Sequence, residues 1–142
     1  MCEMLAVRGN GTGTTFALSE VLPLAAELER LGIAGFGWGV AWHNLETGLV
    51  RHGVQPDSLH AHLEEAQARL GNERADAALV HLRRPSQLST IGLADTQPFY
   101  SKRHGFAFAH NGDFAQHEAL RPRYLEGIAG RKSRERGRFS TL

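Results

Sequence analysis

Two strand-like runs stand almost end to end in the first half of the chain, at residues 35–44 (GFGWGVAWHN) and 47–54 (TGLVRHGV). Runs this close, with only the residues NLE at their junction, predict a hairpin of antiparallel β-strands. The other strand-like and helix-like segments follow one another without a strict strand–helix–strand alternation. A doubly wound parallel sheet requires that alternation, so the order of the elements favours an α+β fold.

Apolar periodicity places the remaining elements. Residues 3–8 and 75–83 are strand-like, and Phe106 and Phe108 alternate with alanines in a strand that leads to a turn at Asn111-Gly112. We expect a first helix capped by Ser19 and ended by Gly32, and a second helix from Leu59 to Gly71. Residues 114–126 predict a short third helix that Pro122 weakens.

Length and composition indicate one folded domain. The 142 residues are enough for a substantial core, and 42% hydrophobic with 22% charged residues exclude the disordered class. No apolar run reaches the ~20 residues that cross a bilayer, and no secretion-type leader is evident. A single cysteine fits a reducing compartment. We therefore expect a cytoplasmic protein with no membrane contact.

Positive charge gathers near the C-terminus although the formal net charge is only +1. We expect residues 1–126 to form the domain and residues 127–142 to form a basic tail. A solvated tail is the simpler interpretation of these arginines and lysines. A small nucleic-acid-binding protein that uses this tail is the alternative.

The only thiol of the chain belongs to Cys2, directly after the initiator methionine. If Met1 is removed, Cys2 carries both a thiol and a free α-amino group, and the pKa of such an amine is ordinarily about 7.7–8.0. One residue can then supply the nucleophile and its own base. A buried or incidental thiol is the competing interpretation.

Two other segments contain groups that such a nucleophile needs. HLRRPS places Arg83 or Arg84 at the end of a strand, where a guanidinium can bind a carboxylate through two hydrogen bonds. In AFAHNGDF, the Asn111 side chain and the Gly112 N–H can face one point, as an oxyanion hole requires. Each segment alone is more often an ordinary surface charge or a simple turn.

Five segments in order carry a resemblance to a known family: MCEMLAVRG, GFGWGVAW, HLRRPS, DTQPF and FAHNGDF. The sequence resembles the class II glutamine amidotransferases of the N-terminal nucleophile hydrolase superfamily, and looks closest to their small stand-alone members. The resemblance covers most of the first 115 residues. It implies a four-layer αββα sandwich of two antiparallel sheets, which we expect to be incomplete in this short chain. Open sheet edges would favour a homodimer.

The resemblance also implies a reaction. Cys2 would attack the side-chain amide of glutamine or a related small amide, and Asn111 and Gly112 would hold the oxyanion. Arg83, two residues after His81, would bind the α-carboxylate, with His81 and His110 at the substrate-binding site. No cofactor is implied. A catalytically impaired homologue that acts as a binding or regulatory subunit is the alternative.

One family segment has a different composition here. Small members carry a Thr-Asp-Ser-Glu type stretch after the HNG motif, and its Asp holds the α-amino group of glutamine. Lys132 and Ser133 stand at the corresponding place, so the sequence offers no matching acid there, with Glu135 as a partial substitute. Among the histidines, His60 and His62 fall on different faces of the second helix, and we expect no metal site.

Overall fold

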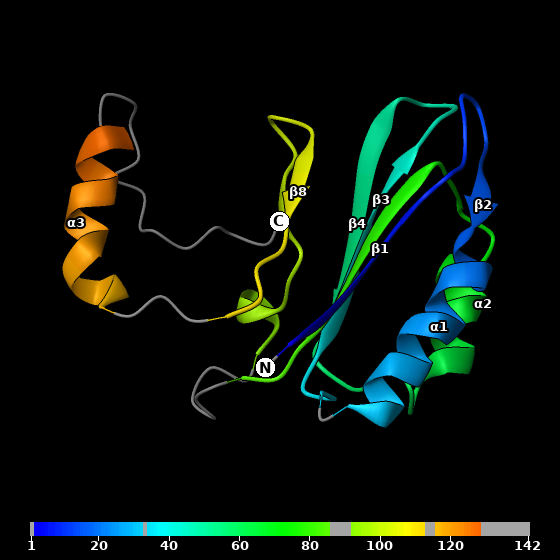
Figure 1. Cartoon of the computed structure of the whole chain (residues 1–142), viewed down its shortest axis with the longest axis horizontal. Helices are drawn as coiled ribbons and strands as arrows, with labels where there is room; N and C mark the ends of the chain where they lie inside the picture. Colours follow the sequence, from blue (N-terminus) through cyan, green and yellow to red (C-terminus); the bar gives the residue numbers. More distant parts are fainter. Residues whose placement is uncertain (1, 33, 86–91, 113–115, 129–142) are drawn as a thin grey trace.

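The computed structural model describes residues 2–32, 34–85, 92–112 and 116–128. Its centre is a four-stranded antiparallel sheet in the order β1-β6-β3-β4. The strands are β1 (Glu3–Arg8), β6 (Ala77–Leu82), β3 (Trp38–Asn44) and β4 (Leu49–Gln55). Helices α1 (Leu18–Leu31) and α2 (Leu63–Leu70) cover one face of this sheet (Figure 1). The fold is mixed α/β with antiparallel sheets, and the expected β3–β4 hairpin is confirmed.

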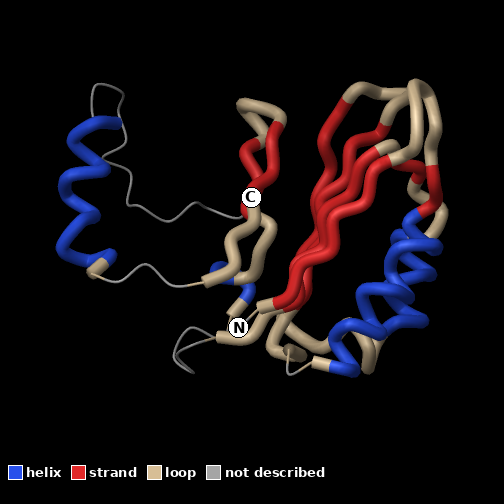
Figure 2. Tube along the Cα trace, viewed as in Figure 1, coloured by secondary structure: helices blue, strands red, loops and turns tan. Residues whose placement is uncertain are grey.

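Smaller elements complete the described chain. Figure 2 shows the β7–β8 hairpin on the face of the sheet opposite the helices, with α3 beyond it. The Tyr100 hydroxyl donates to the Val50 carbonyl at 2.9 Å and thereby ties the hairpin to β4. The elements are β2 (Phe16–Ala17), paired with β5 (Arg74–Ala75), η2 (Leu93–Asp95), β7 (Phe99–Ser101), β8 (Phe106–Phe108) and α3 (His117–Ile128).

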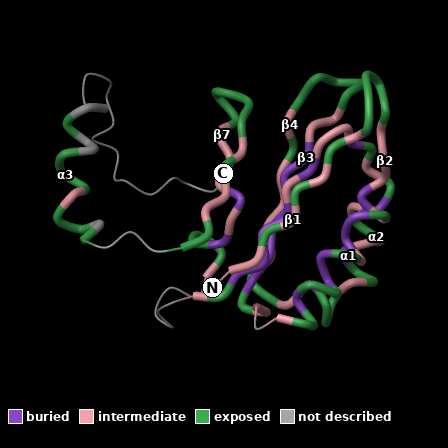
Figure 3. Tube along the Cα trace, viewed as in Figure 1, coloured by how far each residue is buried: buried purple, intermediate pink, exposed green. Residues whose placement is uncertain are grey.

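The hydrophobic core fills the layer between the two helices and the sheet (Figure 3). Antiparallel register aligns Leu5, Val80 and Val40 across three neighbouring strands, and their side chains face α1. The opposite face is less covered, since Met4 is 42% exposed there. The fully buried apolar side chains of the core are Leu18, Leu22, Ala25, Val40, Leu59, Ala75, Val80 and Leu82.

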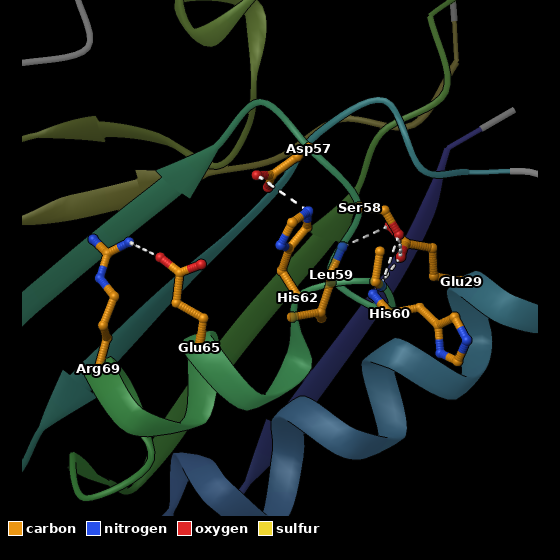
Figure 4. A network of polar contacts seen from close by, with 9 residues as sticks. Glu29, Asp57, Ser58, Leu59, His60, His62, Glu65 and Arg69 are labelled. Carbon is orange, nitrogen blue, oxygen red and sulfur yellow. Dashed lines mark hydrogen bonds and ion pairs between the residues drawn. The ribbon is translucent and has the colours of Figure 1, made fainter.

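A buried carboxylate joins the end of α1 to the segment before α2 (Figure 4). Glu29 is 5% exposed and accepts hydrogen bonds from the Ser58 hydroxyl at 2.6 Å and the His60 N–H at 2.6 Å. It also accepts the Leu59 N–H at 3.3 Å. These contacts hold residues 58–62 in a turn, so α2 begins at Leu63 and the expected start at Leu59 was wrong.

The start of α1 also differs from the expectation. Ser19 lies inside the helix, and Ala17 occupies the capping position. The Glu20 carboxylate accepts the Ala17 N–H at 2.8 Å, which is the reciprocal half of a capping box, here made without a capping hydroxyl. The helix ends at Gly32 as expected, where the Gly32 N–H donates to the Leu28 carbonyl at 2.9 Å.

Replacing Glu29 by alanine is expected to lower the free energy of unfolding by about 2–4 kcal/mol, because buried donors then lose their acceptor. Urea unfolding measures the change. Glu27→Ala is the matched control, since Glu27 lies on the same helix but makes a half-exposed ion pair with Arg30. A Glu29→Ala loss no larger than that of Glu27→Ala would contradict the assignment.

Among the described helices, none has the length and apolar character that a membrane span requires.

Candidate functional site

The thiol of Cys2 lies against the main chain that follows β6. The Arg84 N–H donates to the Cys2 Sγ at 3.3 Å, and the Cys2 thiol donates to the Arg84 carbonyl oxygen at 3.4 Å. The register explains this contact: Glu3 pairs with Leu82, so the residues just beyond them continue the same antiparallel ladder. Cys2 is therefore fixed at the edge of the sheet and is partly accessible.

Asn111 lies beside Cys2 although the two residues are far apart in the sequence. Its Nδ2 donates to the Cys2 carbonyl at 2.6 Å, across 109 residues of sequence. Gly112 follows with φ +123°, a left-handed conformation that side-chain-bearing residues rarely adopt. The Asn111-Gly112 turn thus lies directly beside the cysteine.

Arg83 and Arg84 differ in their surroundings. Arg83 is 6% exposed, and its N–H donates to the Gly37 carbonyl at 2.7 Å, which extends the pairing of β6 with β3. Strand alternation puts the Arg83 side chain on the same face as that of His81, the face that bears the β7–β8 hairpin. The Arg84 side chain is exposed. Both arginines therefore lie near the cysteine, and Arg83 is the one that is buried.

His81 is fully buried on this face of the sheet. Burial lowers its pKa to about 4, assisted by the nearby charges of Arg83 and His110 and opposed by a contact with the His110 backbone. The imidazole is therefore neutral at ordinary pH. Since its side chain has no exposed surface, any effect of His81 on substrate binding has to pass through its neighbours.

Stability should fall with acid because of His81. Between pH 6.5, its ordinary pKa, and pH 4, the unfolded chain binds a proton that the folded chain does not. The free energy of unfolding is expected to drop by about 3 kcal/mol across that window. Urea titrations at stepped pH measure this slope. His81→Gln should greatly reduce it, with a remainder from His52, whose pKa burial also lowers, and the exposed His60→Gln should keep it. Equal slopes for wild type and His81→Gln would refute the assignment.

His110 is held by a residue to which the sequence pattern assigns no role. Its N–H donates to the Gln97 Oε1 at 2.5 Å. Gln97 lies in the DTQPF segment, which the family resemblance includes without a function for this residue. Gly39, the glycine of GFGWG that lies in β3, was the available signal, because a glycine within a strand often marks a close approach of another backbone.

The structure therefore brings together Cys2, Arg83, Asn111 and Gly112, with His81 and His110 packed close to them. Other candidates lie elsewhere. His62 stands 3.9 Å from Asp57 on the helical side of the sheet (Figure 4). Within the described ranges no group of His, Cys, Asp and Glu has the geometry of a metal site. The basic residues 131–138, with Lys132 and Ser133, lie outside the described residues.

Comparison with protein families matches residues 1–129 to the family described as "Glutamine amidotransferases class-II". No curated protein matches the chain.

Proposed function

The chain belongs to the class II glutamine amidotransferases, and from this premise we propose that it hydrolyses the side-chain amide of glutamine, or of a related small amide. The observation that carries the proposal is the 2.6 Å hydrogen bond from Asn111 Nδ2 to the Cys2 carbonyl. This hydrogen bond supports the assignment of Cys2 as the nucleophile and Asn111 as an oxyanion donor of the same site, although the two residues are far apart in the sequence.

The first step is attack by sulfur on the amide carbon. Once Met1 is removed, the free α-amine of Cys2 accepts the thiol proton. The Arg84 N–H that points at the sulfur at 3.3 Å stabilises the negative charge that develops on it. A carbon–sulfur bond forms while the electrons of the carbonyl π bond move to the oxygen.

Asn111 and Gly112 then stabilise that oxygen. A side-chain amide carries two N–H donors, and the bond to the Cys2 carbonyl uses one of them. This bond fixes the plane of the group, and we assign the second N–H to the oxyanion. The Gly112 N–H is the other donor, presented by a backbone conformation that favours glycine.

Collapse of the tetrahedral intermediate breaks the carbon–nitrogen bond. The α-amine returns its proton to the departing nitrogen, and ammonia leaves. Water attacks the resulting thioester and releases glutamate and the free thiol. We assign the binding of the α-carboxylate of glutamine to Arg83, a buried residue that directly follows β6, where the main chain runs beside Cys2.

The finer architecture belongs to the same proposal. We infer that the four-stranded sheet with α1 and α2 forms one half of an αββα sandwich. The β7–β8 hairpin would occupy the position of the second sheet, since it packs on the face opposite the helices and Tyr100 bonds to β4.

The test is release of glutamate and ammonia in equal amounts from glutamine by the purified chain. Intact mass must first show that Met1 is absent, and asparagine serves as the control amide, one methylene shorter. Release from glutamine well above that from asparagine is expected. A processed chain that releases neither product from any small amide would overturn the proposed function.

A further inference from the structure

Gln97 links the sheet to the catalytic turn. Its Oε1 accepts the His110 N–H at 2.5 Å, one residue before Asn111. Its main-chain carbonyl lies against Gly39 of β3, the strand residue that pairs with His81. The position of the Asn111-Gly112 turn therefore depends on a side chain that reaches it from a loop packed on the sheet.

The loop that carries Gln97 lies directly on β3 because one glycine stands in this strand and another just before it. A Cβ added to Gly39 would stand 2.3 Å from the Gln97 carbonyl oxygen and 2.9 Å from Pro98 Cδ. A Cβ on Gly37 would stand 3.0 Å from the Thr96 hydroxyl. Residues 96–98 therefore occupy space that any larger residue at these two positions would fill.

Other contacts anchor this loop on both sides of Gln97. Thr96 is fully buried, and its hydroxyl donates to the Gly92 carbonyl at 2.9 Å. After it, Pro98 is buried, and Tyr100 stacks on His52 with ring centroids 5.5 Å apart. Gln97 thus projects from a rigid base, and a rigid base is what an orienting side chain needs.

We propose that Gln97 is a positioning residue for catalysis: by holding the His110 N–H, it sets the distance from the Asn111 amide and the Gly112 N–H to the substrate oxygen. The inference rests on the proposed function and goes beyond it, because Gln97 acts through the oxyanion donors and not on the sulfur. A substitution of Gln97 that loses this hydrogen bond should therefore lower kcat for amide hydrolysis and leave the rate of Cys2 alkylation unchanged.

Three variants of Gln97 separate this role from a general need for a side chain there. Gln97→Met keeps the length and removes the strong acceptor, and Gln97→Asn keeps the amide but shortens its reach. Gln97→Glu keeps an acceptor oxygen at the same reach. Gln55→Met is the matched control, since Gln55 is another half-buried glutamine, at the end of β4.

The first readout is hydrolysis of glutamine. For Gln97→Met and Gln97→Asn we expect kcat to fall about 10- to 100-fold, the size of effect that a small misplacement brings, with KM within about threefold. Gln97→Glu should stay within about threefold of wild type. When Gln97→Met is added to Asn111→Ala, kcat should fall by less than about a further threefold, because both changes act on one turn.

The second readout is alkylation of Cys2 by iodoacetamide, a displacement that forms no oxyanion. Its rate should be the same within about twofold in wild type and Gln97→Met, because the thiol environment is unchanged. Thermal unfolding checks that each variant is folded. Hydrogen exchange of residues 108–112 should rise in Gln97→Met and Gln97→Asn but not in Gln97→Glu.

An active wild type with an equally active Gln97→Met overturns this inference alone. Equal losses in Gln97→Met and Gln97→Glu, accompanied by slower alkylation, overturn it as well, because they indicate a general disturbance of the site. A processed wild type that releases no glutamate overturns the proposed function instead, and the catalytic part of the inference with it.

Discussion

Replacing Cys2 by serine or alanine is expected to reduce glutamine hydrolysis by a factor on the order of 10⁴ to 10⁶, which is the loss that removal of a covalent nucleophile brings. The reason is that no other residue can take over the step: Cys2 is the only cysteine of the chain. A serine hydroxyl in its place is a far poorer nucleophile at neutral pH. The folded state should change little, since Cys2 is only partly buried at the edge of the sheet.

Glutamate release measured over a range of enzyme concentrations checks this result. The single thiol offers a chemical control, because iodoacetamide should inactivate the wild type in proportion to the alkylated fraction. Intact mass should show one added group in the wild type and none in either variant. Hydrolysis that survives in Cys2→Ala at more than about a tenth of the wild-type rate would rule Cys2 out as the nucleophile.

Replacing Asn111 by alanine is expected to reduce kcat by about 10²–10³-fold, the typical loss of one oxyanion donor. Two effects add here. The alanine removes the N–H that we assign to the oxyanion, and it removes the bond to the Cys2 carbonyl that fixes the chain start. Since neither contact is specific to the ground state of the substrate, KM should change much less than kcat.

Asn44→Ala is the matched control for Asn111. Asn44 also sits in a tight turn, where its side chain accepts the Thr47 N–H at 3.0 Å, but it lies at the far end of β3 from the site. The control should lose about 1 kcal/mol of stability and keep its kcat. Equal rates for wild type and Asn111→Ala would exclude Asn111 from the oxyanion hole.

The strands were predictable because their signals are local. The alternation in EMLAVR and the short junction between β3 and β4 predicted strand β1 with its observed limits and the central hairpin. The helix starts were less predictable. The start of α2 depends on Glu29, a residue of another helix, and no pattern within residues 58–63 contains that information.

The candidate site, like the fold, was predictable from the sequence only in part. Residue types and their order along the chain predicted Cys2, Arg83 and the Asn111-Gly112 turn as candidates, and in the structure Asn111 contacts Cys2. The burial of His81 was not predictable, because it arises when distant segments cover a sheet face that the sequence shows only as alternating residues. Gln97 was missed for the same reason: its place depends on a strand almost 60 residues earlier, where Gly39 makes room for it.

The most direct measurement is the site of reaction with an electrophilic glutamine analogue, such as one that carries a diazoketone in place of the side-chain amide. Mass spectrometry of the intact and digested protein should find one adduct per chain, on the sulfur of a Cys2 whose α-amine is free. Excess glutamine should slow the labelling of the wild type. Without added glutamine, Asn111→Ala should be labelled more slowly than the wild type. A retained methionine before Cys2, or an adduct on any other residue, would contradict the account.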